Sequence, residues 1–165
     1  MRGRSQKRLL MVCVGNLCRS PMAEAVMREV ISRAGLEKDW HVDSASIESW
    51  HTGSQPDSRV LNILANHNID YKNHQARQLT EDDFVKFDYI FGMDPNNMES
   101  LKRMAPQYAT AKLLLLGGFG LHPDNRTIED PYYEMGEAAF EKIFNQCNVA
   151  CQCFLKQARA NEIIM

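Results

Sequence analysis

Apolar residues near the start of the chain change from a continuous run to a helical spacing. The run from Leu9 to Val14 has the length and character of a buried strand. From Pro21, apolar residues recur every three or four positions up to Gly35, which predicts a helix. The segment "CVGNLCRS" joins the two, so the pattern predicts a strand, a loop and a helix.

The same alternation of strand and helix patterns continues toward the C-terminus. Further runs of strand length lie at residues 40–46, 89–93 and 112–116. Helical stripes lie over residues 60–67, after Asp94 and Pro95, and over residues 140–158. Short apolar strands alternating with helices predict an α/β fold with a four-stranded parallel sheet, flanked by helices on both faces. We expect a single domain over residues 1–165, with its core at about 7–160.

Composition narrows the class of protein. Lys and Arg total 19 against 21 Asp and Glu, and they are dispersed, so nucleic acid is not the favoured partner. The basic start is followed by too short an apolar stretch for a signal peptide, and no segment has the ~18 apolar residues of a membrane span. Five cysteines, an odd number, indicate free thiols in a reducing compartment. We therefore expect a monomeric, soluble, cytoplasmic protein.

The loop after the first strand has the features of a phosphate-binding loop. Ligands of parallel sheets bind at the carboxyl ends of the strands, where this loop lies. Gly15 and Asn16 tolerate left-handed backbone angles, which lets successive N–H groups point toward one site at a helix N-terminus. Arg19 adds a planar guanidinium that can bind two phosphate oxygens together.

Cys13 stands at the base of this loop. A cysteine among N–H dipoles and beside a guanidinium is stabilised as the thiolate, which is a nucleophile. Ser20 either caps the helix, points its hydroxyl at the thiolate, or does both. A cysteine at a strand end is ordinarily a small buried hydrophobe, but Cys13, Gly15, Asn16 and Arg19 together meet several requirements of one mechanism.

The stretch "VCVGNLCRSPMAEA" closely resembles the signature of the low-molecular-weight protein tyrosine phosphatases. "DSASIESWHTGSQPDSR", "HQARQLTEDDFVKFDYIFGMD" and "IEDPYY" extend the resemblance over nearly the whole chain. It implies a hydrolase of phosphotyrosine, working through a phosphocysteine without a metal ion or other cofactor. Cys13 would be the nucleophile, Arg19 the phosphate clamp and Asp130 the general acid. The choice of Asp130 over Asp94, Asp124 or Glu129 rests on the resemblance alone.

The resemblance also implies a set of binding and supporting residues. The substrate-binding set is Val14, Gly15, Asn16, Leu17, Cys18, Ser20, Trp50, Tyr132 and Tyr133. Trp50 and Tyr132 would enclose the phosphotyrosine ring, or else be ordinary half-buried aromatics. Ser44 and His74 would brace the loop through Asn16, although a solvated loop histidine is an alternative for His74. Phosphotyrosine-containing proteins would be the partners and inorganic phosphate the product, with no nucleic acid or membrane involved.

The remaining candidate side chains have simpler interpretations. His67 lies on an apolar helix stripe and is expected to be a core histidine with its hydrogen bonds satisfied. Cys147, Cys151 and Cys153 lie on or near a buried helix face without a matching histidine or cysteine pair, so we expect core thiols and no metal site. Ser46 and Ile47 depart from the Gly-Thr of many family members, which bears on the loop before Trp50.

Two other functions and one redox hypothesis also follow from the sequence. A thioredoxin-coupled arsenate reductase has a similar fold and loop, but residues 79–111 lack the further cysteines that it uses. A non-catalytic phosphotyrosine-binding module would not need Cys13, Arg19 and Asp130 intact. Because the loop curls around an anion, we also expect Cys18 to come within disulfide reach of Cys13 and to protect it from peroxide.

Overall fold

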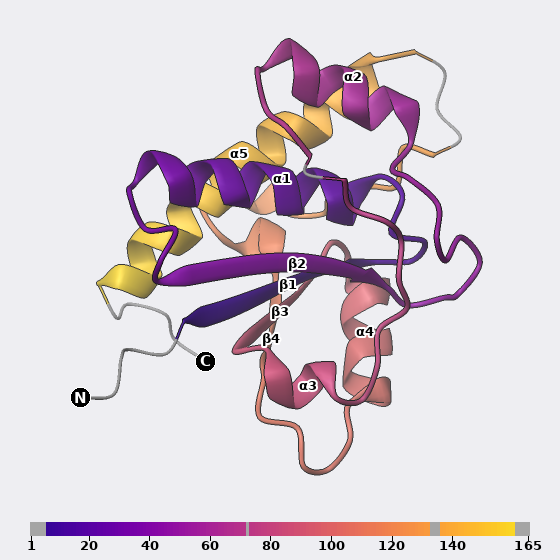
Figure 1. Ribbon diagram of the computed structural model, residues 1–165, viewed down its shortest axis with the longest axis vertical. Coiled ribbons are helices and arrows are strands. Elements are labelled where there is room, and N and C mark those ends of the chain that lie inside the picture. The colour runs from indigo at the N-terminus through magenta and orange to yellow at the C-terminus, as the bar shows by residue number, and fades with distance from the viewer. Residues whose placement is uncertain (1–5, 72, 133–135, 161–165) are drawn as a thin grey trace.

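The computed structural model describes residues 6–71, 73–132 and 136–160, and Figure 1 shows a sheet lying between two layers of helices. The strands are β1 (Lys7–Cys13), β2 (Trp40–Ser46), β3 (Tyr89–Gly92) and β4 (Lys112–Leu115). Their order in the sheet is β2-β1-β3-β4, and every neighbouring pair is parallel. The predicted four-stranded parallel sheet is therefore confirmed, with its first strand in the interior.

Helices cover both faces of the sheet, as expected. One layer holds α1 (Arg19–Arg33), α2 (Ser58–Asn66) and α5 (Ala138–Arg159), and the other holds α3 (Asp83–Lys86) and α4 (Pro95–Met104) (Figure 1). Two short 3₁₀ turns, η1 (Leu116–Gly118) and η2 (Pro123–Asn125), follow β4. Within the described ranges, no helix combines the length and apolar character that crossing a membrane requires.

The side chains of β1 alternate between two apolar clusters. Leu9, Met11 and Cys13 belong to the cluster under α1 and α5, whereas Leu10 and Val12 belong to the cluster on the side of α3 and α4. Successive side chains of a strand point to opposite faces, and β1 is buried on both. Cys13, the last residue of the strand, therefore points to the face where α1 begins.

Helix α1 begins two residues before the predicted Pro21. Its N-cap residue is Cys18, whose side chain makes no capping hydrogen bond. The helix ends at Arg33, and Gly35, at φ 72°, provides the left-handed backbone that commonly follows a helix end. The first turn of α1 thus receives no acceptor from its own N-cap side chain, which suits the binding of an external anion.

His67 differs from the expected core histidine. Its Nε2 lies 2.7 Å from a carboxylate oxygen of Glu141, and its ring stacks on Phe144 with centroids 3.8 Å apart. Its side chain is nonetheless 36% exposed. The prediction of satisfied hydrogen bonding was right and that of a core position was wrong, because His67 is the C-cap of α2, at the rim of the packed layer.

The three C-terminal cysteines lie on α5 as expected. Cys147 and Cys151 are fully buried, and Cys153 is partly buried. Burial raises the pKa of Cys147 to about 12, so it remains a neutral thiol at physiological pH.

Candidate active site

The Cys13 sulfur lies at the head of α1 and faces two hydrogen-bond donors. Ser20 Oγ is 3.0 Å from Cys13 Sγ, and the Ser20 backbone N–H points at the same sulfur from 3.4 Å. Asn16 Nδ2 donates to Ser20 Oγ at 2.7 Å. Because the Ser20 oxygen already accepts this bond, its own proton is available to donate to the sulfur. The arrangement directs two hydrogen-bond donors at the sulfur.

Asn16 supports the loop from beneath. It is fully buried and adopts φ 58°, a left-handed conformation that asparagine tolerates better than most residues. Its Nδ2 also donates to Ser44 Oγ at 3.0 Å, and its Oδ1 accepts from His74 Nε2 at 2.8 Å. A fourth bond to the Asn16 side chain comes from the Arg77 backbone N–H, which donates to Oδ1 at 3.2 Å. Every polar atom of the Asn16 side chain is thus used to hold the loop.

Glu24 completes this network, and the sequence analysis missed it. Its Oε1 accepts from Ser44 Oγ at 2.6 Å and lies 3.2 Å from His74 Nδ1. The His74 side chain is only 8% exposed, so the solvated alternative for it does not fit the structure. A signal was present in the sequence, because Glu24 is an acidic residue four positions after Ser20 on the apolar face of α1.

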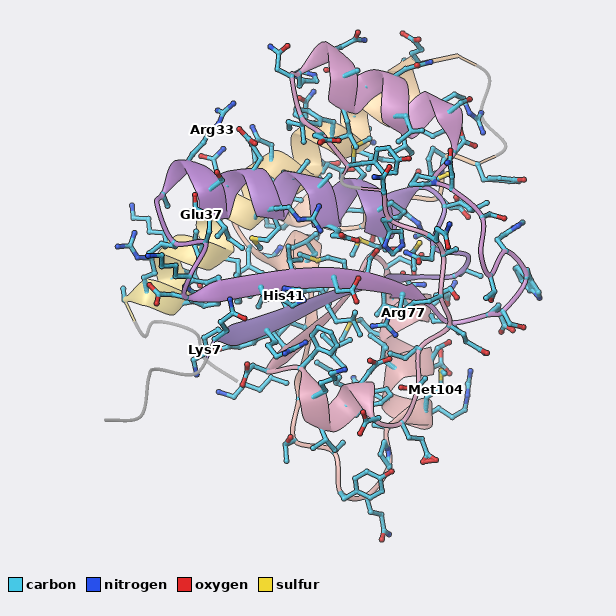
Figure 2. The ribbon with its side chains drawn as sticks, viewed as in Figure 1. Lys7, Arg33, Glu37, His41, Arg77 and Met104 are labelled. Carbon is cyan, nitrogen blue, oxygen red and sulfur yellow. The ribbon has the colours of Figure 1, made fainter. Side chains whose placement is uncertain are left out.

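Glu24, Asp43 and His74 bring three potential metal-ligand atoms within 4.8 Å of one another. The Glu24 carboxylate, however, pairs with Arg28, and the Asp43 carboxylate pairs with Arg77 at 3.2 Å. Figure 2 shows Arg77 near the end of β2 that adjoins the loop. Two guanidinium groups thus already neutralise the two carboxylates. We therefore interpret the cluster as support for the phosphate-binding loop and not as a metal site.

Arg19 is 2% exposed and is held in place by two acceptors. Its Nη1 donates to Asp94 Oδ2 at 2.6 Å and to the Ile128 carbonyl at 3.0 Å. Burial lowers the pKa of Arg19, but the neighbouring Cys13 and Asp94 outweigh this effect and raise it above its ordinary value. Arg19 is therefore a fixed positive charge beside the Cys13 sulfur.

Asp94 has a second contact besides Arg19. Its Oδ1 accepts from the Asn97 backbone N–H at 2.7 Å, so it is the predicted N-cap of α4. Both of its oxygens are therefore engaged, which leaves it poorly suited to donate a proton to a substrate.

A cavity of about 80 Å³ lies above the Cys13 sulfur. It is lined by Cys13, Val14, Gly15, Leu17, Cys18, Arg19, Trp50, His51, Asp130 and Tyr132. Of the four carboxylates that the sequence left open, only Asp130 is in this lining. Its Oδ2 lies 3.9 Å from Arg19 Nη2, and its Oδ1 accepts from the Tyr132 backbone N–H at 3.1 Å. Asn16 and Ser20, which the resemblance assigns to substrate binding, are not in this lining, and they hydrogen-bond to each other next to the Cys13 sulfur.

Aromatic side chains form the mouth of the cavity. Trp50 is 69% exposed and Tyr132 is 36% exposed, while the predicted Tyr133 lies outside the described residues. His51, which the sequence analysis missed, lies with its ring centroid 6.2 Å from that of Tyr132. A Cβ atom on Gly15 would come within 3.0 Å of the His51 ring, so this close approach favours glycine.

Ser46 and Ile47, the two departures from the family pattern, point inward. Ser46 Oγ donates to the Arg77 carbonyl at 3.1 Å, and Ile47 is 8% exposed. The Ile47 backbone N–H donates to the Cys13 carbonyl at 3.0 Å. The segment leading to Trp50 is therefore joined directly to the end of β1.

A larger hollow, about 460 Å³, lies between α1 and β2. Its lining includes Arg28, Glu37 and His41, and among the residues that the structure describes it includes no cysteine. In Figure 2, Glu37 and His41 lie toward the N-terminal end of β2, away from the loop. The smaller cavity, which joins a nucleophile, a cation and a carboxylate, is the better candidate for chemistry on a phosphoryl group.

Known proteins match both the sequence and the fold. The family "Low molecular weight phosphotyrosine protein phosphatase" matches residues 8–163. The low molecular weight phosphotyrosine protein phosphatase 2 of Drosophila melanogaster is 64% identical and covers 98% of each chain. The structure of Primo-1 is 48% identical, with a TM-score of 0.89 over 92% of this chain and 97% of its own. The structure of Drosophila arginine phosphatase is 37% identical, with a TM-score of 0.87 over 93% and 98%.

Proposed function

The chain belongs to the low molecular weight phosphotyrosine protein phosphatase family, and from this premise we propose that Cys13, Arg19 and Asp130 carry out its reaction. Membership makes it a cysteine-dependent phosphatase that acts on phosphotyrosine without a metal ion. One observation supports the residue assignment above all others. A sulfur that faces two N–H or O–H donors shares one cavity with a buried guanidinium and a carboxyl group.

In the first step the Cys13 thiolate attacks phosphorus in line with the ester oxygen. The S–P bond forms as the P–O bond to the tyrosyl oxygen breaks, and Asp130 gives its proton to the departing phenolate. Arg19 and the loop N–H groups neutralise charge on the equatorial oxygens in the transition state.

In the second step water attacks the phosphocysteine. Asp130, now a carboxylate, takes a proton from the water as the P–S bond breaks, and inorganic phosphate leaves. The Ser20 hydroxyl and backbone N–H stabilise the departing thiolate, as they do in the resting site.

The substrate class follows from the mouth of the cavity. Trp50 and Tyr132 provide exposed aromatic faces for the ring of phosphotyrosine. Leu17 places an apolar side chain in the lining. The resemblance implies that an apolar residue here is typical of the tyrosine-selective members, in contrast to the threonine of bacterial arginine phosphatases. Because one structural relative is named an arginine phosphatase, the matched test compares peptides carrying phosphotyrosine, phosphoserine and phosphoarginine. Comparable turnover of all three would contradict this selectivity.

The partners and setting form part of the same proposal. Phosphotyrosine-containing proteins are the substrates, and the enzyme acts as a monomer in the cytoplasm. Five free cysteines support a reducing compartment.

Asp130→Ala tests the assignment of the acid. Loss of a general acid slows hydrolysis by about 10² to 10⁴. The loss in kcat/KM, which reports the first step, should shrink as the leaving phenol becomes more acidic, since such a phenolate departs without a proton. Asp124→Ala, which removes the 91% exposed carboxylate of η2, is the matched control and should leave the rate unchanged. Equal loss across the phenol series would assign the acid to another residue.

A further inference from the structure

We propose that Arg59 in the first turn of α2 is a positioning residue, which holds the segment carrying Asp130 in place over the phosphate-binding loop. The inference rests on the proposed role of Asp130 as the general acid. Arg59 does not line the cavity, so it acts through its contacts on either side.

The first side of Arg59 is joined to the phosphate-binding loop through Asp57. Arg59 Nε and Nη2 donate to the two Asp57 carboxylate oxygens at 3.0 and 2.9 Å. Asp57 also caps α2, because its Oδ1 accepts from the Arg59 backbone N–H at 2.9 Å. The Asp57 backbone N–H in turn donates to the Leu17 carbonyl at 2.9 Å. The start of α2 is thereby fixed to the loop that surrounds Cys13.

The second side of Arg59 is joined to the acid-bearing segment, residues 128–132. Arg59 Nη2 donates to the Tyr132 carbonyl at 2.9 Å, and the Tyr132 N–H donates to Asp130 Oδ1 at 3.1 Å. The other end of the segment is held separately, because the Ile128 N–H donates to the Met93 carbonyl at 2.9 Å. Asp130 thus lies between one anchor at Ile128 and one at Tyr132.

The Arg59 guanidinium is also oriented from below. Its Cζ lies 4.4 Å from the ring centroid of Phe140, a fully buried residue of α5. A planar guanidinium can stack on a ring, pair with a carboxylate in bidentate fashion and still donate to a carbonyl, whereas an ammonium group cannot match all three contacts. Arginine at this position can therefore hold the Tyr132 carbonyl at a fixed distance from Asp57, which lysine could not.

The consequence concerns the acid specifically. The Asp130 side chain is 48% exposed, so surrounding packing does little to fix it. Without Arg59, the hydrogen bond to the Tyr132 carbonyl is lost, so the segment is held less firmly and the carboxyl group spends less time within reach of the leaving oxygen. In the first step, substrates that need the proton are slowed, while substrates with good leaving groups are not.

The experiment measures kcat/KM for Arg59→Ala over a series of aryl phosphates whose phenols differ in acidity, because kcat/KM reports the first step and not the hydrolysis of the phosphocysteine that all substrates share. We expect about a tenfold loss for phenyl phosphate, because a small displacement of a catalytic group costs up to about 10². For the most acidic phenol the loss should be under about twofold, because that leaving group needs no proton. For Arg59→Lys, the rate with phenyl phosphate should lie between that of Arg59→Ala and that of the wild type. Arg33→Ala, which removes an arginine paired with Glu29 on the exposed face of α1, is the matched control and should leave every rate unchanged (Figure 2).

A second background separates positioning from general damage. In an Asp130→Ala background, Arg59→Ala should cost less than about twofold, since the group it positions is gone. A loss that persists in that background, or is equal for all phenols, would overturn the inference. If Asp130→Ala itself shows no dependence on the phenol, the proposed acid fails and the role of Arg59 fails with it. If the loss of rate depends strongly on phenol acidity for Asp130→Ala but not for Arg59→Ala, the positioning role of Arg59 is refuted and the role of Asp130 is not.

Asp57→Asn provides the test if Arg59→Ala does not fold. Asparagine caps a helix as well as aspartate does, so α2 should remain intact while the ion pair to Arg59 is lost. The loss of rate in Asp57→Asn should depend on phenol acidity in the same way as the loss in Arg59→Lys. An equal loss for all phenols would again contradict the inference.

Discussion

Substitution of Asp94 separates two contributions to the free energy of unfolding. Asp94→Asn keeps a good N-cap for α4 but removes the negative partner of buried Arg19. Asp94→Ala removes both. Comparing the two variants therefore assigns one part of the loss to the ion pair and the other to the cap.

The expected magnitudes follow from burial. Breaking a fully buried ion pair costs about 3–5 kcal/mol. Here Asp94 is 19% exposed, and Arg19 keeps the Ile128 carbonyl and its electrostatic interaction with Cys13, so about 1–3 kcal/mol is expected for Asp94→Asn. Loss of the cap in Asp94→Ala should add about 1 kcal/mol.

Urea unfolding of each variant, followed by circular dichroism, measures these differences. Glu29→Gln serves as the control, because the exposed pair of Glu29 with Arg33 is worth about 0–1 kcal/mol. An Asp94→Asn variant as stable as wild type would show that Arg19 does not depend on this carboxylate. Equal stability of Asp94→Asn and Asp94→Ala would refute the capping role.

Three further predictions concern the nucleophile, its oxidation and the effect of pH. Cys13→Ser should retain phosphate binding by calorimetry but lose turnover, and activity above about a hundredth of wild type would exclude Cys13 as the nucleophile. Peroxide should oxidise Cys13 to the sulfenic acid, and the Cys18 thiol should then condense with it, releasing water and forming a disulfide. Mass mapping that finds sulfinic acid at Cys13 with Cys18 still free would end that hypothesis. The Arg59 hydrogen bond lowers the pKa of Asp57 below its ordinary 3.8, so the pair stabilises the fold above that pH and its contribution disappears as the pH falls through the lower folded value. The difference in Tm between wild type and Asp57→Asn should therefore be largest near neutral pH and shrink toward pH 3.

The strands and long helices could be predicted because their patterns are local. The run ending at Cys13 and the stripe of α5 each record, in neighbouring residues, which faces are buried. The four-residue α3 was not predicted, because one helical turn is too short to show a period. His67 was placed in the core because a stripe shows which side of a helix is apolar but not where the packed layer ends.

The site was predictable only in part, for a related reason. A stretch of seven residues contains Cys13, Asn16 and Arg19, so their spacing alone indicates a phosphate-binding loop next to a cysteine. Asp94 and Asp130 reach the same guanidinium from distant segments, and only the folded chain shows which of them enters the cavity. Arg59 ends the stretch "DSASIESWHTGSQPDSR", but its position there does not show its role, because it contacts a backbone carbonyl and an aromatic ring far along the chain.

The dependence of Asn16 on distant partners has a consequence for the order of assembly. The loop that holds Cys13 is synthesised before the residues that brace it, and Ser44 follows some thirty residues later. His74 comes later still, and Asp130 after that. A chain emerging from the ribosome therefore carries Cys13 long before it carries the groups that fix the loop around it. Until β2 has paired with β1 and residue 74 has reached Asn16, the hydrogen bonds that shape this loop are incomplete, so the site is assembled only with the completed fold.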